Sequence, residues 1–138
     1  HTAAGIGVSA QKGGLLMISQ HSTRFHNRVG YHDYEGIALD LDEQQRIVKD
    51  LGSLNALILR NHGLLTAGGS IEEAFYNLYY LERACQAQLA AQSGGAELII
   101  LPDAVSEKAA QAFDTSIRNK KYQLHWDAYI RQLNRNAL

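Results

Sequence analysis

The sequence is poor in residues that cross-link or interrupt a chain. It has one cysteine, Cys85, and one proline, Pro102, in 138 residues. A single cysteine excludes an internal disulfide and is typical of a reducing compartment. No run of about 18 apolar residues is present, and no basic segment followed by an apolar stretch marks a signal peptide. These features predict a cytoplasmic protein without a membrane partner.

Excess charge of either sign is also absent. Thirteen Lys and Arg residues stand against fourteen Asp and Glu residues, which gives a net charge of -1. We therefore expect no nucleic-acid partner, because such partners need a basic surface. The length allows one domain with a real core but not comfortably two. The chain does not begin with methionine, which favours a processed chain or a fragment.

Apolar spacing predicts a mixed α and β protein in which strands come early and helices dominate the end. The expected helices cover residues 2–11, 42–51, 70–92, 103–117 and 120–136, and the expected strands cover residues 15–19, 29–34, 56–59 and 64–67. In the helix at 42–51 we expect Ile47, Val48 and Leu51 to face the core.

The helix after Ser70 has the clearest start signal. Ser70 and Glu73 have the spacing of a capping box, in which each side chain binds the other residue's amide. Its predicted apolar stripe is Ala74, Leu78, Leu81 and Cys85. The last helix carries an aromatic face of Tyr122, Trp126 and Tyr129, which a single copy would struggle to cover. This face favours self-association.

The stretch RNHGLLTAGGS, residues 60–70, places His62 directly after the strand at 56–59. Ligands often bind at the end of a strand in open α/β structures, and a neutral imidazole is a good zinc ligand. Gly63 permits unusual backbone angles and leaves space beside His62. The alternative is a hydrogen-bonded structural histidine. His1 is similarly ambiguous, as a remnant of a tag or a residue of a longer motif.

The remaining reactive residues favour structural roles. We expect His21, His26 and His32 to lie in a solvated or subunit-facing segment, and His125 to be structural. Cys85 lies on an apolar stripe, where a thiol behaves as a small hydrophobe. Asp33 and Glu35 point to the same face of a strand. They are candidates for acid and base groups, although a solvated sheet edge explains them equally.

Three segments resemble the class II aldolase/adducin family: HTAAGIGVSAQKGGLLMIS, VGYHDYEGIALD and LILRNHGLLTAGGSIEEAFYNLYYLERACQAQLAA. The resemblance covers roughly residues 2–95. The YHDYEG and LERACQAQ stretches are closer to the adducin-like bacterial branch than to the sugar-phosphate aldolases. The part after Pro102 is more loosely similar to the C-terminal extension of that branch.

The resemblance implies a three-layer α/β/α domain around a mixed central sheet, assembled as a homo-oligomer. Residues 1–101 would form the class II aldolase-like domain without its N-terminal part, and residues 102–138 a helical C-terminal extension. Family enzymes hold a divalent, zinc-like ion with an His-x-His pair and the turn histidine. His62 matches the turn histidine and His1 the second histidine of the pair. The first histidine and the usual acid/base residue are expected before the start of this chain.

The implied function is that of a metal-dependent aldolase or epimerase-like lyase acting on a small hydroxy-carbonyl, sugar-phosphate-like compound. A divalent metal, with zinc the expected ion, would stabilise the enediolate. Candidates for the acid/base group are Tyr34, Asp33 and the aromatic residues of the last helix. One alternative is a non-enzymatic adducin-like module for assembly and protein contact. Another is an inactive folded part of an enzyme.

Overall fold

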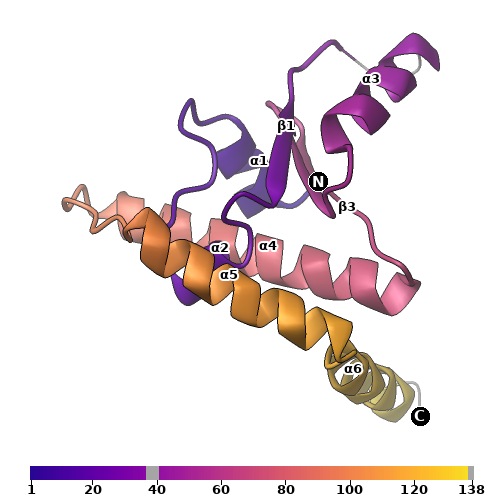
Figure 1. Cartoon of the computed structure of the whole chain (residues 1–138). Coiled ribbons are helices and arrows are strands. Elements are labelled where there is room, and N and C mark those ends of the chain that lie inside the picture. Colours follow the sequence, from indigo (N-terminus) through magenta and orange to yellow (C-terminus); the bar gives the residue numbers. More distant parts are fainter. Residues whose placement is uncertain (37–40, 137–138) are drawn as a thin grey trace.

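The computed structural model describes residues 1–36 and 41–136 (Figure 1). Residues 37–40, the end of the VGYHDYEGIALD segment, lie outside this part. The elements in chain order are α1 Ala3–Ser9, α2 Gln20–Thr23, β1 Val29–His32, α3 Leu41–Leu51, β2 Ala56–Leu59, β3 Gly63–Thr66, α4 Ile71–Ser93, α5 Asp103–Arg118 and α6 Tyr122–Asn136. None of the helices in the described ranges has the length and apolar character needed to cross a membrane.

The three strands form one mixed sheet in the order β1-β2-β3. β1 runs parallel to β2, with Val29 opposite Ala56. β3 runs antiparallel to β2, with Gly63 opposite Leu59. The carboxyl ends of β1 and β2 therefore share one edge of the sheet, and the turn that carries His62 lies at that edge.

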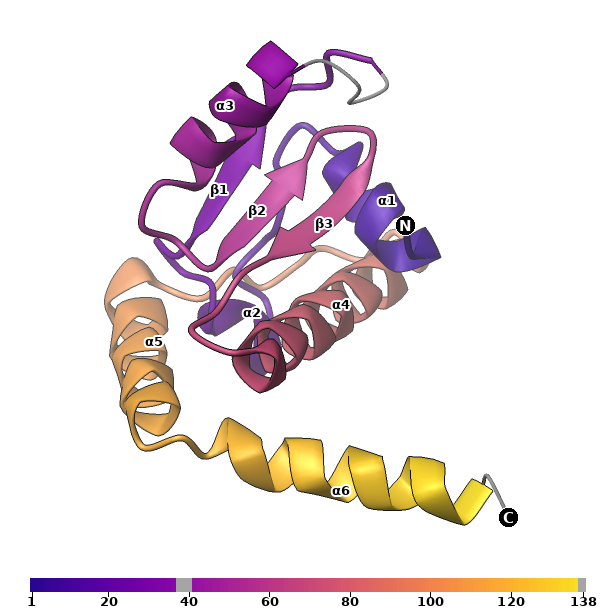
Figure 2. The ribbon, with the colours of Figure 1, turned by 90° about the vertical axis from the view of Figure 1, so that its right-hand side faces the viewer.

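Helices cover both faces of the sheet (Figure 2). Successive side chains of β2 point to opposite faces. Ile58 belongs to the core formed with α1 and α4. On the other face, a Cβ on Gly30 would meet Leu57 and the carbonyl of Asp50 in α3 at 2.9 and 2.8 Å. This arrangement confirms the predicted three-layer α/β/α fold with a mixed sheet.

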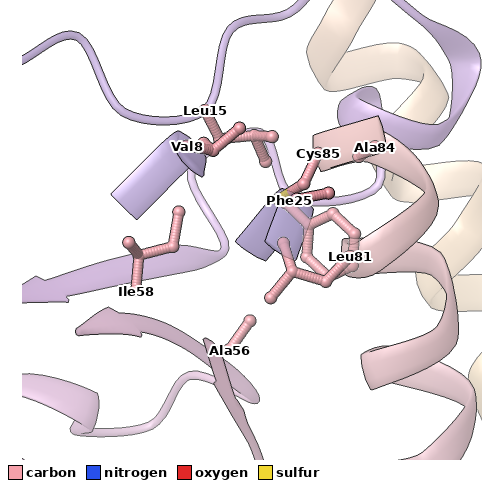
Figure 3. Packing of buried hydrophobic residues seen from close by; sticks show 9 residues of the cluster. Val8, Leu15, Phe25, Ala56, Ile58, Leu81, Ala84 and Cys85 are labelled. Carbon is pink, nitrogen blue, oxygen red and sulfur yellow. The ribbon is translucent and has the colours of Figure 1, made fainter. Parts of the chain in front are cut away.

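The main core lies between the sheet, α1 and α4 (Figure 3). Val8, Ile58, Leu81 and Cys85 are completely buried there. Full burial of an aliphatic side chain stabilises a fold by about 1.5–3 kcal/mol. The contacts join residues from 8 to 85, so this core holds the two ends of the family-like region together.

The strand predicted at 15–19 is wrong. This segment is irregular, and side chains bind its backbone where a neighbouring strand would otherwise do so. Leu15 N donates to the Tyr31 hydroxyl at 3.1 Å, and Leu16 N donates to Gln88 Oε1 at 2.7 Å. Gln88 lies on α4 and is fully buried. An apolar run that pairs with side chains cannot be distinguished from a strand by its pattern alone.

The other predicted elements are confirmed, but two side chains that were predicted to face the core do not. Val48 is 68% exposed and Leu78 is 39% exposed, although both were predicted to face the core. The buried positions of α4 include polar Gln88 and aromatic Tyr76. A count of aliphatic residues therefore misplaces the buried face of this helix by part of a turn.

The capping box at the start of α4 forms only in part. Ser70 Oγ accepts from the Glu73 amide at 3.3 Å, as predicted. The Glu73 carboxylate instead accepts from the Gly69 amide at 3.1 Å. Two amides near the helix start are still satisfied, one of them a residue earlier than the motif specifies.

The aromatic face of α6 packs against α4 and is covered in part within the chain, with Trp126 and Tyr129 half-buried. Phe75 of α4 makes edge-to-face contacts with Trp126 and Tyr129, at centroid distances of 5.6 and 5.3 Å. Tyr122 is buried. Such pairs contribute about 0.5–1.5 kcal/mol each beyond their buried area. The exposed apolar residues of α6 are Leu124, Ile130 and Leu133.

Candidate functional site

The turn between β2 and β3 consists of Arg60, Asn61 and His62. The backbone angles on either side of His62 explain why asparagine and glycine flank it. Asn61 has φ +57° and Gly63 has φ +146°. Asparagine tolerates the left-handed region better than most residues, whereas the angle at Gly63 strongly favours glycine. The His62 amide closes the turn by donating to the Leu59 carbonyl at 3.0 Å. The two flanking residues thus turn the chain and present the His62 side chain.

Helix α1 places His1 beside this turn. Thr2 caps the helix by accepting from the Gly5 amide at 3.1 Å. A Cβ on Gly5 would lie 2.7 Å from Leu64 Cγ on β3, so the helix approaches the strand closely only because Gly5 has no side chain. The Asn61 amide also donates to the Ser9 carbonyl at 3.3 Å. Both ends of α1 are thereby fixed against the β2–β3 hairpin.

The two histidines meet through their Nε2 atoms, which lie 2.6 Å apart. The rings are stacked, with centroids 4.6 Å apart and planes inclined by 29°. His1 is exposed and His62 is half-buried. Two imidazole nitrogens aimed at each other can share a proton or can ligate one cation.

The geometry of the pair fits two ligands of one divalent ion after a small movement. Zinc binds imidazole nitrogen at about 2.0–2.1 Å, which places two ligands of a tetrahedral site about 3.3 Å apart. The Nε2 atoms would therefore need to separate by about 0.7 Å. Within residues 1–36 and 41–136, no group of three or more His, Cys, Asp or Glu side chains is arranged to hold a metal. The chain thus presents two donors, and a tetrahedral site needs further ligands.

Two hollows border the turn that carries His62. A small cavity of about 20 Å³ is lined by His62 together with His32, Asp33, Tyr34 and Glu43 among others. This volume corresponds to about one water molecule. A wide, open depression of about 550 Å³ has Asp33 and Tyr34 in its wall as well. Both predicted acid/base candidates therefore lie next to the turn that carries His62.

Polar side chains from the segment after α1 and from the turn complete the wide depression. Its wall includes Lys12, Arg60 and Asn61. The Arg60 guanidinium donates to the Gln11 carbonyl at 2.8 Å and lies 4.3 Å from the centre of the Tyr31 ring. Two cations beside an open hollow can attract a small anion.

The aromatic residues of α6 do not reach these hollows within one chain. Trp126 and Tyr129 pack against α4, and Figure 2 shows α6 on the far side of α4 from the β2–β3 turn. Glu35, which shares a strand face with Asp33 in the prediction, forms an ion pair with Arg46. Asp33 and Tyr34 are the remaining predicted acid/base candidates near His62.

The other histidines differ in burial. His21 is exposed, as expected, and partial burial with nearby Arg24 and Arg83 lowers its pKa. His26 and His32 are buried within the chain, so the prediction of a solvated or subunit-facing position is wrong for both. His125 is half-buried against Tyr76, in agreement with a structural role.

His32 is the residue near the site whose surroundings the sequence analysis missed. Its Nδ1 lies 2.7 Å from Asp50 Oδ2, and its Nε2 lies 3.8 Å from Glu43 Oε1. Glu43 and Asp50 are seven residues apart on α3 and therefore lie on one face. The sequence signal that could have revealed this pair is the spacing of the two carboxylates. Glu43 and Asp50 lie on the same helical face as Ile47, which was predicted to face the core.

Cys85 is buried as predicted. Its burial raises the pKa of the thiol to about 12. A thiol with so high a pKa is almost entirely protonated near neutral pH, and only the thiolate is a good nucleophile. Cys85 therefore acts as a core residue.

Comparisons with known proteins agree with this architecture. The family profile described as Class II Aldolase and Adducin N-terminal domain matches residues 1–89. A Pseudomonas aeruginosa protein, whose name assigns it provisionally to the aldolase class 2 proteins, is 49% identical over 137 residues, covering 97% of this chain and 53% of that protein. Alpha-adducin of Rattus norvegicus is 46% identical over 112 residues, covering 79% of this chain and 15% of that protein.

Solved structures show the same relationship. An aldolase II superfamily protein from Pseudomonas syringae superimposes with a TM-score of 0.92 and 52% identity, covering 99% of this chain and 55% of that one. The L-fuculose 1-phosphate aldolase of Glaciozyma antarctica superimposes with a TM-score of 0.69 and 28% identity, covering 81% of this chain and 41% of that one. The chain spans about half the length of the bacterial curated relatives it matches. With the profile covering most of the chain, the protein belongs to the class II aldolase and adducin family.

Proposed function

We propose that this chain forms part of a metal-dependent aldolase or epimerase-like lyase that acts on a small hydroxy-carbonyl compound. The observation that carries the proposal is the pair of Nε2 atoms of His1 and His62, 2.6 Å apart at the carboxyl end of β2. Membership of the class II aldolase family supports it. Residues 1–101 would be the family domain and residues 102–138 its helical extension.

His1 and His62 would hold a divalent cation, with zinc the expected ion. Such an ion, when bound, would stabilise the negative charge that develops on the oxygens of an enediolate. Stacking of the two rings and the tight turn around Asn61 would keep the two nitrogens close together. Preorganised ligands lower the reorganisation needed when charge develops.

Proton transfer would fall to Asp33 or Tyr34, which line both hollows beside His62 and Asn61. Both side chains are exposed, so either could reach a substrate in the open depression. Lys12 and Arg60 in the same wall would attract a phosphate or carboxylate on the substrate. A small, negatively charged hydroxy-ketone is the substrate class that fits these groups.

Solvent exchange tests this proposal without knowledge of the full substrate. The intact protein, loaded with zinc, would be mixed with dihydroxyacetone phosphate in D₂O, and loss of the carbon-bound proton would be followed by NMR. We expect exchange in the wild type and in His21→Ala, and a loss of at least about a hundredfold in His62→Ala. Equal exchange in wild type and His62→Ala would contradict the proposed role.

An adducin-like assembly module is the second candidate. It is favoured by the 46% identity to alpha-adducin and by the exposure of Leu124 and Leu133 on α6, at 72% and 63%. In either case we propose a homo-oligomer that buries this outer face. Light scattering at micromolar concentration should give a mass above one chain for wild type and a lower mass for the double change of Leu124 and Leu133 to Gln.

A further inference from the structure

A second cavity lies at the opposite end of β2 from His62. It has a volume of about 350 Å³, and its walls come from four parts of the chain: the segment after α2, the residues before β2, α4 and α5. Cavities of this size commonly hold small molecules. Apolar and aromatic side chains form much of the lining: Phe25, Leu54, Ala56, Tyr76, Tyr80, Phe113 and Ile117.

Two arginines in this wall provide an internal comparison. Arg28 binds Asp114 through the edge formed by Nε and Nη2, at 3.0 and 2.8 Å. It also forms an ion pair with Glu107 at 2.9 Å. The charge of Arg28 is therefore balanced by carboxylates of α5, and its donors are occupied.

Arg24 is held equally firmly but has no carboxylate partner within the described part of the chain. Its guanidinium lies 3.6 Å from the centre of the Tyr80 ring and 3.8 Å from that of Phe113. Nη1 donates to the Tyr76 hydroxyl at 3.0 Å. The two rings cover the faces of the group, so its N–H donors point outward in the plane.

The donor edge that Arg28 uses for Asp114 has an unpaired Nε in Arg24. Arg24 Nε is buried and makes no hydrogen bond among the described residues. A buried donor without a partner costs free energy, and a charged donor costs more. A carboxylate on this edge would form two parallel charge-assisted hydrogen bonds. The site therefore offers, to an outside ligand, the same interaction that Arg28 makes within the chain.

We propose that the cavity binds a small organic acid: a carboxylate held by the Nε and Nη2 edge of Arg24, attached to an apolar, ring-sized body. The aromatic and aliphatic lining would cover that body. Ser53, Asn55 and Asn77 add polar residues to the lining. Asp114, which also lines the cavity, is paired with Arg28, and Arg118 adds a further positive charge to the lining. The site lies away from His62 and does not depend on the proposed lyase activity.

4-Fluorobenzoate is a suitable probe, with neutral 4-fluorobenzamide as the matched control. Binding to the intact protein would be followed by ¹⁹F NMR up to about 10 mM, the affinity range of small fragments. We expect the benzoate to bind at least about tenfold more tightly than the amide, because only the benzoate can pair with Arg24. Equal binding of the two, or no binding of the benzoate, would overturn the proposal.

Variants locate the binding. Arg24→Gln should weaken benzoate binding at least about tenfold, and Arg131→Gln, which changes an exposed arginine of α6, should leave it within about twofold. Circular dichroism would verify folding. If Arg24→Gln does not fold, the Arg24 Nε–H signal of the wild type provides the test in ¹H–¹⁵N spectra. Movement of that signal on titration supports the site, whereas movement of other arginine signals alone overturns it.

Discussion

The core between the sheet, α1 and α4 differs in kind from the contacts that attach α5 and α6. The core is built from aliphatic side chains with no exposed surface, such as Val8 and Leu81. α5 is attached through an arginine and two carboxylates in addition to its buried Ser106 and Ala110, and α6 through edge-to-face aromatic pairs. Apolar burial involves no charge that salt could screen or pH could titrate, whereas half-exposed ion pairs respond to both. The two regions should therefore respond differently to the same perturbation.

The largest expected effect comes from the core. Leu81→Ala should lower the free energy of unfolding by about 2–5 kcal/mol, because it leaves a cavity among residues that cannot collapse fully. Urea denaturation measures this loss. Val48→Ala, at a position of α3 that is 68% exposed, is the matched control and should change stability by less than about 0.5 kcal/mol. Similar losses for the two changes would contradict the assigned core.

A smaller and more local effect is expected at α5. Arg28→Met removes both ion pairs and should destabilise the docking of α5 by about 1–2 kcal/mol. Hydrogen exchange should rise in α5 while the amides of β2 stay protected. Arg131→Met serves as the control. Uniform acceleration across the sheet would show that α5 is part of the main cooperative unit.

The junction between the two regions is the start of α4, which carries Phe75 beneath α6. Ser70→Ala removes the side chain that caps the Glu73 amide and should cost about 1 kcal/mol. Exchange should rise first near Phe75, and with it the solvent exposure of Trp126, seen as a red shift of its fluorescence. Ser93→Ala, at the other end of α4, should leave the fluorescence unchanged. An unchanged spectrum for Ser70→Ala would show that the packing of α6 against α4 does not depend on this cap.

The smallest effect is that of pH on α5. Hydrogen bonds from Arg28 lower the pKa of Glu107 from 4.5 to about 2. A lowered pKa in the folded state means that Glu107 contributes stability above its usual pKa, and that this stability is lost as pH falls towards about 2. Protection of the α5 amides from hydrogen exchange should therefore weaken in wild type as the pH falls from 4.5 to about 2. The change should be shallower in Glu107→Gln, and equal profiles would exclude Glu107 as the titrating group.

Much of the sheet and most helices could be predicted from the sequence, because their signals are local. The run at residues 56–59 and the cap at Ser70 each depend on neighbours within a few positions. The predictions that failed concern segments whose structure depends on residues far away in the sequence. Residues 15–19 have the pattern of a strand, but Gln88 and Tyr31 bind their amides.

The site was predictable only to the extent that the family motif names its residues. His62 and His1 are 61 positions apart, and no spacing rule links them; the close approach of Gly5 to Leu64 brings them together. The burial of His32 against Asp50 also depends on tertiary packing. The unpaired Nε of Arg24 also depends on tertiary packing, and it is recognised by comparison with the paired Nε of Arg28.

The most direct measurement is the metal content of the intact, tag-free protein by elemental mass spectrometry, after exposure to zinc and removal of unbound ions. Paired histidines at the end of β2 predict about one divalent ion per chain in wild type and in His21→Ala, and a loss of nearly all of it in His62→Ala. A wild-type protein that holds no metal, or a His62→Ala protein that retains it, would contradict the metal site at His1 and His62.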